Sequence, residues 1–213
     1  MLGEIYLYGT NFIGTMLLLP QYIGLISQAQ KFGELINRAI SSIQIPLYPL
    51  ISRSNKKDSL DKIVKVYRII FFISCLLALT TCIILKPFVH LFYGEEFIPI
   101  VKIFYILTPG LIMESASLVL KSYCNGIGKA IISSYILLVP MILQLILSFV
   151  LIKDFGYIGA AASLSIGKVL FGFLFLMWFT KYAQIPIVNL LPSKHDLYFI
   201  LDFLKERFIF KKS

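Results

Sequence analysis

The chain has 213 residues, of which 58% are hydrophobic and only 15% charged, and its mean hydropathy is +0.85. A soluble domain carries about 25% charged residues. This composition therefore excludes an ordinary soluble protein and indicates an integral membrane protein. The apolar segments along the chain predict an all-α fold, a bundle of about six transmembrane helices. The net charge of +9 does not require a nucleic-acid partner, because the basic residues lie between apolar stretches, as the positive-inside rule expects.

The amino-terminal part predicts two membrane helices of different character. Residues 5–19 are apolar but short for a span and end at Pro20, which fits a membrane helix whose beginning lies in a longer protein. The second predicted helix covers about residues 32–51 and contains several polar residues. A polar and basic loop is expected to follow at residues 52–68.

The middle of the chain predicts two further helices joined by a short turn. The third covers about residues 69–91, and Gly94-Glu95-Glu96 supplies the turn. The fourth covers residues 97–121. It is expected to be interrupted at Pro109-Gly110, since proline lacks the amide donor that a helix needs.

The fifth and sixth predicted helices follow a tight basic turn at residues 125–129. Residues 130–152 contain no Asp, Glu, Lys, Arg or His residue. At about 1.5 Å per residue they are long enough to cross a hydrocarbon core of roughly 30 Å as a helix. Pro140 is expected to kink this helix. The sixth helix, residues 158–180, opens with a run of small residues that favours close helix packing, and Lys168 is its one charged residue.

These elements divide the chain into a six-helix transmembrane lobe at residues 1–182 and a tail at residues 183–213. The connections are too short for a soluble domain. In the tail, Leu197, Leu201, Leu204 and Phe208 fall on one helical face. This spacing predicts an amphipathic helix on the inner leaflet. A solvated tail with incidental periodicity is the alternative.

The distribution of basic residues predicts the orientation of the helices. Fourteen Lys and Arg residues lie in segments assigned to one side, residues 53–68, 121–129 and 181–212. Four lie on the other side: Lys31, Lys86, Lys102 and Lys153. Since cytoplasmic loops are enriched in Lys and Arg, the first side is predicted to be cytoplasmic, with both termini on it.

Lys168 is the strongest candidate for a functional residue. It lies ten residues into the sixth predicted helix, near the bilayer centre, where a lysine costs roughly 2.5–3.5 kcal/mol. One interpretation is a cation in a watery cavity, positioned to attract an anionic substrate. The alternative is a lysine paired with a carboxylate to hold helices together.

Three other ionisable residues are candidates for a substrate-binding site. Glu34 and Arg38 are one helical turn apart and able to pair. They either line the mouth of a cavity or form an interfacial ion pair. Glu114 follows Gly110 in the fourth predicted helix. It either pairs with a cation across the bundle, for structure alone, or takes up a coupling proton.

The sequence gives no indication of catalysis, and no metal or other cofactor is expected. It contains no HExxH, GxSxG or P-loop motif. Cys75, Cys82 and Cys124 have neither a metal-ligand spacing nor that of a disulfide framework. A non-enzymatic membrane protein is the prediction.

Three sequence pieces together resemble a known family. They are INRAISSIQIPLYPLISRS at residues 36–54, VHLFYGEEFIPIVKIFYILTPGLIM at residues 89–113, and a basic Gly-x-Gly turn followed by a long apolar helix and DFGYIGAAAS at residues 154–163. Their order and spacing resemble the carboxy-terminal lobe of polysaccharide flippases of the O-antigen (Wzx) type. These belong to the multidrug/oligosaccharidyl-lipid/polysaccharide (MOP) exporter superfamily, which has a MATE-like fold.

The resemblance implies a function, a partner and a location. Such a lobe is half of a transporter that flips a polyprenyl-diphosphate O-antigen or capsule repeat unit across the bacterial inner membrane by alternating access. Its partners would be the lipid-linked oligosaccharide, membrane lipids, and an amino-terminal lobe or a second copy. The anionic group that Lys168 would attract is then the diphosphate of the lipid-linked sugar. The alternatives are a cation-coupled multidrug exporter of the same superfamily and a non-transporting scaffold of polysaccharide assembly.

Overall fold

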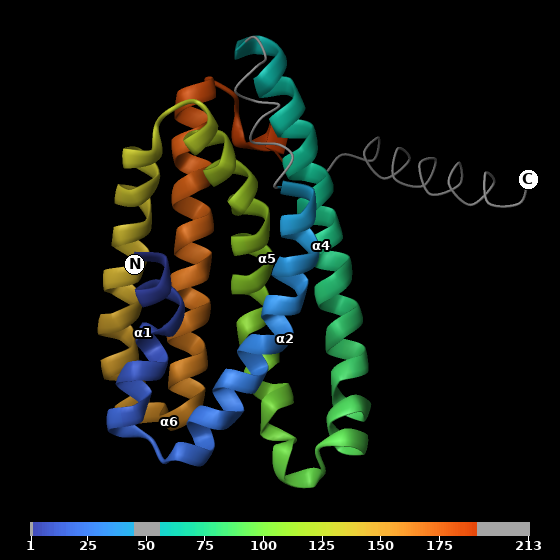
Figure 1. The fold of residues 1–213 in the computed structure, drawn as a ribbon, viewed down its shortest axis with the longest axis vertical. Helices are drawn as coiled ribbons and strands as arrows, with labels where there is room; N and C mark the ends of the chain where they lie inside the picture. Colours follow the sequence, from blue (N-terminus) through green and yellow to red (C-terminus); the bar gives the residue numbers. More distant parts are fainter. Residues whose placement is uncertain (1, 45–55, 191–213) are drawn as a thin grey trace, which may run out of the picture.

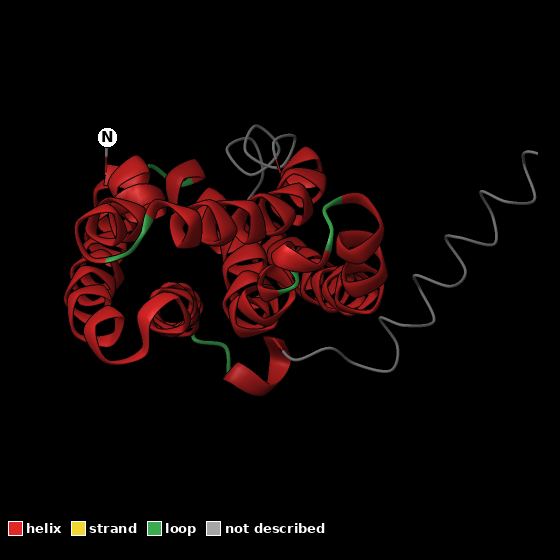
Figure 2. Cartoon of the chain, turned by 90° about the horizontal axis from the view of Figure 1, so that it is seen from below, coloured by secondary structure: helices red, strands yellow, loops and turns green. Residues whose placement is uncertain are grey.

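The protein is all-helical throughout residues 2–44 and 56–190, the parts that the computed structural model describes. Figure 1 shows long helices side by side, and in the view from below most are seen end-on (Figure 2). The helices are α1 (Leu2–Leu17), α2 (Pro20–Gln44), α4 (Lys56–Phe92), α5 (Pro99–Gly126) and α6 (Ala130–Ala183), with short 3-10 turns η1 (Glu95–Phe97) and η2 (Ile187–Leu190). The predicted all-α class is confirmed.

Three described segments are long and apolar enough to cross a membrane: Leu60–Phe92, Glu95–Gly126 and Ala130–Ala183. Large apolar side chains cover their outer surfaces, as on α4, where Leu79 is 60% and Ile83 75% exposed. Exposed leucine and isoleucine of this density suit a lipid environment. The chain is therefore compatible with a membrane-embedded protein.

Helix α6 is a hairpin of two antiparallel arms. Gly156 has φ 57° and ψ −135°, non-helical values that reverse the direction of the chain. The arms approach closely beyond it, because a Cβ on Gly159 would lie 1.9 Å from the Leu151 carbonyl oxygen. These arms coincide with the fifth and sixth predicted helices. The backbone around Pro140 keeps helical dihedral angles, and the break in the helix falls at Gly156.

The predicted starts of two helices are wrong. Helix α2 begins at Pro20 rather than at residue 32, because proline suits the first turn of a helix, where no amide donor is needed. Helix α4 begins at Lys56, so most of the predicted loop at residues 52–68 is helical. In the first part of α4, Ile63, Tyr67 and Ile70 are buried at helical spacing. The charged residues between them hide this apolar pattern in the sequence.

Helix α5 lies at the centre of the helix bundle. It packs against α6, α4 and α2, while α1 packs mainly on α6. It also continues without a break through Pro109-Gly110, contrary to the predicted interruption. Gly110 packs directly against α6, where a Cβ would lie 2.9 Å from the Ser165 carbonyl oxygen. Packing on α6 therefore supports the helix at this point.

The described chain ends with η2 against α4. Arg68 Nε donates a hydrogen bond of 2.6 Å to the Asn189 carbonyl oxygen. Residues 191–213, including the predicted amphipathic helix, lie outside the described residues.

Candidate functional site

The site is centred on a buried ion pair between α5 and α6. Lys168 Nζ contacts Glu114 Oε2 directly, and the side chains are only 9% and 6% exposed. Gly110, one turn before Glu114, allows this contact, since a Cβ there would lie 2.9 Å from the Lys168 Cβ. Two of the predicted site residues are therefore partners. The attraction between them offsets part of the cost of burying the two charges.

Helix α2 reaches this ion pair through Asn37. Asn37 Nδ2 donates a hydrogen bond to Glu114 Oε2 at 3.1 Å, and Asn37 Oδ1 accepts one from Ser115 Oγ. Close packing one turn earlier makes this possible, because a Cβ on Gly33 would lie 2.7 Å from Leu111 Cδ2. We call Glu114, Lys168, Asn37 and Ser115 the charged cluster. It joins three helices that are distant in sequence.

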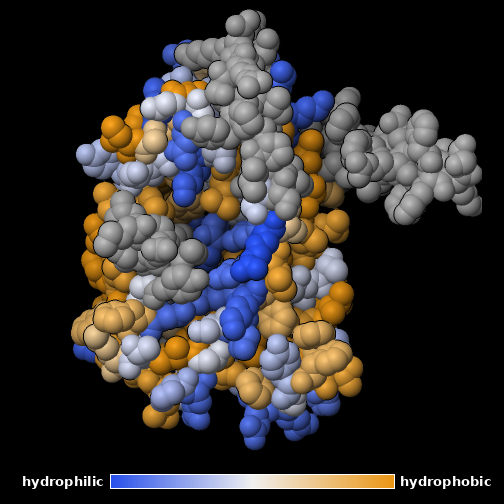
Figure 3. Space-filling model, in the orientation of Figure 1, coloured by the Kyte–Doolittle hydropathy of each residue, from blue (hydrophilic) through white to orange (hydrophobic). Residues whose placement is uncertain are grey.

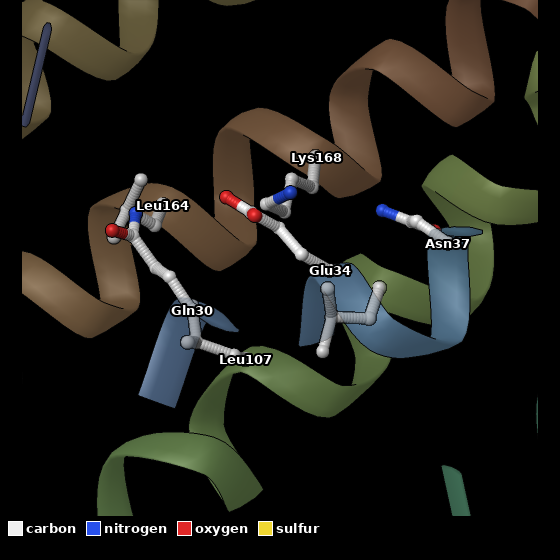
Figure 4. Close-up of a pocket in the computed structure, with 7 residues that line it drawn as sticks. Gln30, Glu34, Asn37, Leu107, Leu164 and Lys168 are labelled. Carbon is white, nitrogen blue, oxygen red and sulfur yellow. The ribbon is translucent and has the colours of Figure 1, made fainter. Parts of the chain in front are cut away.

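A small pocket lies beside the charged cluster, between α2, α5 and α6 (Figure 4). Its free volume of about 30 Å³ is enough for one or two water molecules. We call it the inner pocket. Its lining residues are Gln30, Glu34, Asn37, Leu107, Leu111, Leu164 and Lys168.

The inner pocket brings two carboxylates close to one lysine, and the outer of the two, Glu34, is also paired with the largely exposed Arg38. Lys168 and Glu114 neutralise one another, and Figure 4 shows the Glu34 carboxylate also pointing toward Lys168. Gln30 is held at the edge of the pocket by Asn11, whose Nδ2 donates to Gln30 Oε1 at 2.8 Å. A small cation or a proton matches this space and charge better than a bulky anion does.

A larger pocket adjoins the inner one on the outward side of α2. Its volume is about 350 Å³, within the range of small-ligand sites. We call it the outer pocket. Its lining residues are Gln28, Lys31, Phe32, Glu34, Leu35, Arg38 and Tyr93.

Glu34 lines both pockets and therefore connects them. Arg38 NH2 lies 3.7 Å from Glu34 Oε2, and the two side chains are 77% and 36% exposed. Figure 3 shows hydrophilic residues running obliquely across this face, along α2, beside a hollow and between hydrophobic surfaces. The predicted pair is thus formed, on the open side of the site.

The structure brings all four predicted residues into one region but divides them into two pairs. Lys168 pairs with Glu114, and Arg38 with Glu34. Sequence reasoning gave no role to Asn37 or to Gln30, because it considered only ionisable groups. Their spacing from Glu34, at i+3 and i−4, was the available signal for a shared helical face.

A second buried polar cluster lies apart from the pockets, between α1 and the two arms of α6. Thr10 Oγ1 lies 2.9 Å from Ser148 Oγ and accepts a hydrogen bond of 3.0 Å from Gln144 Nε2. Ser148 Oγ also lies 2.9 Å from Ser163 Oγ. We call these four residues the hydroxyl cluster. It contains no charge.

Within the described residues, no group of three or more His, Cys, Asp or Glu side chains could hold a metal ion. Cys75, Cys82 and Cys124 are free thiols.

Comparison of the chain with protein-family models, with curated proteins and with solved structures gave no match. The flippase assignment therefore depends on the sequence motifs and stays a prediction.

Proposed function

We propose that this chain is one lobe of a flippase that carries the sugar-diphosphate head of a polyprenyl-linked oligosaccharide across a bacterial inner membrane by alternating access. In this proposal α1, α2, α4, α5 and the two arms of α6 are the six membrane-spanning helices of the lobe. An amino-terminal lobe or a second copy completes the cavity. The motifs at residues 36–54, 89–113 and 154–163 support the family.

The observation that carries the proposal is the polar face of α2. Gln30, Glu34 and Asn37 line a pocket inside an assembly whose other surfaces are largely apolar. Polar and charged groups facing lipid are costly, so in membranes they border water or protein partners. A polar face that connects an open pocket with a buried ion pair suits a translocation path. A scaffold needs no such path.

The pockets suggest a division of roles that differs from the sequence-based hypothesis for Lys168. That lysine is already neutralised by Glu114, and the adjoining space of about 30 Å³ is too small for a diphosphate. Lys31 and Arg38 in the outer pocket are better placed to attract the anionic head. We assign the charged cluster and Glu34 to uptake of a coupling cation.

A transport assay tests the proposal. The protein is expressed from its own locus, so that any lobe encoded beside it is present. The protein is reconstituted in vesicles with a fluorescent polyprenyl-diphosphate disaccharide, and probe reaching the outer leaflet is measured with an impermeant quencher. Flipping should exceed that in empty vesicles and be lost in the Lys31→Gln/Arg38→Gln double variant.

The matched control is Lys86→Gln/Lys102→Gln, which removes the same charge from exposed positions that line neither described pocket. It should flip the probe at the unmodified rate. Flipping no faster than in empty vesicles would contradict the proposal. Equal loss in both double variants would contradict the assignment of the head to the outer pocket.

A cation-coupled exporter of apolar cations is the second candidate. The Glu34 carboxylate, which is the second one beside Lys168, and the aromatic rings of Phe32 and Tyr93 in the outer pocket favour it. Efflux of a cationic dye from cells, lost in Glu34→Gln and unchanged in Lys31→Gln/Arg38→Gln, would select this function over the flippase.

A further inference from the structure

An apolar crevice lies between α2 and α4. Its volume is about 190 Å³, and its lining residues are Phe32, Thr80, Thr81, Ile84, Leu85 and Phe88. The two threonine hydroxyls need no partner from the crevice, because Thr80 Oγ1 donates to the Leu76 carbonyl and Thr81 Oγ1 to the Leu77 carbonyl, each at 2.8 Å. The crevice is therefore suited to hydrocarbon.

The crevice adjoins the outer pocket. Phe32 lines both. Its ring packs edge-on against Phe88 with the centroids 6.1 Å apart, and Phe88 lies 6.3 Å from Tyr93, another lining residue of the outer pocket. Three aromatic rings thus lie along the boundary between a space with charged side chains and an apolar one.

We infer that the outer pocket and the crevice form one amphipathic site, which holds a prenyl-diphosphate carrier lipid with its first isoprene units in the crevice. Lys31 and Arg38 would bind the diphosphate. A single narrow crevice suits a lipid with one chain, whereas a phospholipid has two. The inference rests on the proposed flippase function and adds that the protein itself holds the start of the tail.

Binding of a carrier tail from within a bilayer gains little from the hydrophobic effect, since lipid is equally apolar, and depends on packing. A test of position is therefore sharper than a test of affinity. The probe is a prenyl diphosphate with a photoreactive diazirine in its second isoprene unit, added to the full chain in phosphatidylcholine nanodiscs. Mass spectrometry then identifies the labelled residues.

The decisive variant is Ile84→Trp, which fills the crevice from a position that is 54% exposed. Its control is Ile83→Trp, at the next residue of α4, which does not line the described crevice. Both variants place tryptophan on an apolar outer surface, and equal melting temperatures would show equal folding. Labelling of Leu85 and Phe88 should be strong in the unmodified chain, lost in Ile84→Trp and retained in Ile83→Trp.

Two results would overturn the inference. Label spread over the outer surface of α4, and unchanged by Ile84→Trp, would mean that the tail lies in bulk lipid. Equal labelling of the crevice by a photoreactive phosphatidylglycerol would mean a general anionic-lipid site. Flipping measured on the same variants separates the two proposals. Crevice labelling without flipping rejects the flippase function alone, and normal flipping by Ile84→Trp with label elsewhere rejects the inference alone.

Discussion

The two buried polar clusters of this protein differ in charge and in access to open space. The hydroxyl cluster of Thr10, Gln144, Ser148 and Ser163 is uncharged and joins α1 to α6 through hydrogen bonds among its own members. The charged cluster places Lys168 and Glu114 beside a pocket that also contains Glu34. The hydroxyl cluster therefore suits a structural role, and the charged cluster suits a functional one.

The difference has a physical basis. A hydroxyl that bonds to a neighbouring hydroxyl or carbonyl is satisfied without water, so it holds helices together at small cost. An ion pair keeps a large desolvation cost that its attraction only offsets, and its protons can move when water reaches it. The comparison therefore predicts that changes in the charged cluster affect transport, and that changes in the hydroxyl cluster affect stability alone.

The largest effect is expected from Lys168→Leu. It leaves the Glu114 carboxylate buried without its cation, which should lower the free energy of unfolding by about 3–5 kcal/mol and abolish transport. Thermal unfolding in detergent and vesicle transport measure the two effects. The double variant Lys168→Leu/Glu114→Leu should recover stability but not transport. Recovery of transport in the double variant would mean that the ion pair is only structural.

The second-largest effect is expected from Glu34→Gln. It removes the second carboxylate near Lys168, and transport should fall by about tenfold, the size of a typical coupling between sites. Stability should change little, because the partner Arg38 is largely exposed and such ion pairs contribute about 0–1 kcal/mol. A normal transport rate in this variant would remove Glu34 from the mechanism.

Asn37→Leu should have an intermediate effect. It removes the donor to Glu114 Oε2 and the acceptor for Ser115, with an expected loss of about 1–3 kcal/mol of stability. Transport should fall several-fold, since α2 is no longer bonded to the ion pair. Denaturant or thermal unfolding together with the transport rate checks this. Loss of stability without any change in transport would place Asn37 with the structural residues.

Ser148→Ala should have the smallest effect. It removes the contacts of Ser148 with Thr10 and Ser163. An interhelical hydrogen bond in a membrane protein contributes about 0.6 kcal/mol on average, so the expected loss of stability is about 1 kcal/mol. Transport should be unchanged once the amount of folded protein is matched. A strong transport defect at normal stability would show that the hydroxyl cluster is also functional, and the comparison between the clusters would fail.

The all-helical fold and the α6 hairpin could be predicted because their signals are local. An uncharged stretch of helical length, a turn residue at Gly156 and small residues after it are all visible in the sequence. The early starts of α2 and α4 were missed because polar residues at exposed positions interrupt the apolar pattern. Burial at Ile63 and Tyr67 becomes evident only when the packing is known.

The candidate site was predictable only in part. The sequence indicates that Lys168 and Glu114 each need a partner, but 54 positions separate them, and only the packing of Gly110 on α6 makes them a pair. The role of Asn37 depends likewise on the close packing of Gly33 on α5. Long-range contacts of this kind leave no periodic pattern in a single sequence.

The central claim is that the polar face of α2 borders water inside the membrane, and thiol accessibility tests it most directly. Cys75, Cys82 and Cys124 are replaced by serine, and Glu34→Cys is compared with Ile83→Cys on the outer surface of α4. A thiol reacts as its thiolate, which requires water. Glu34→Cys should react with a charged, membrane-impermeant methanethiosulfonate reagent in intact membranes, and Ile83→Cys should not. Equal resistance of both variants to the reagent would contradict the account.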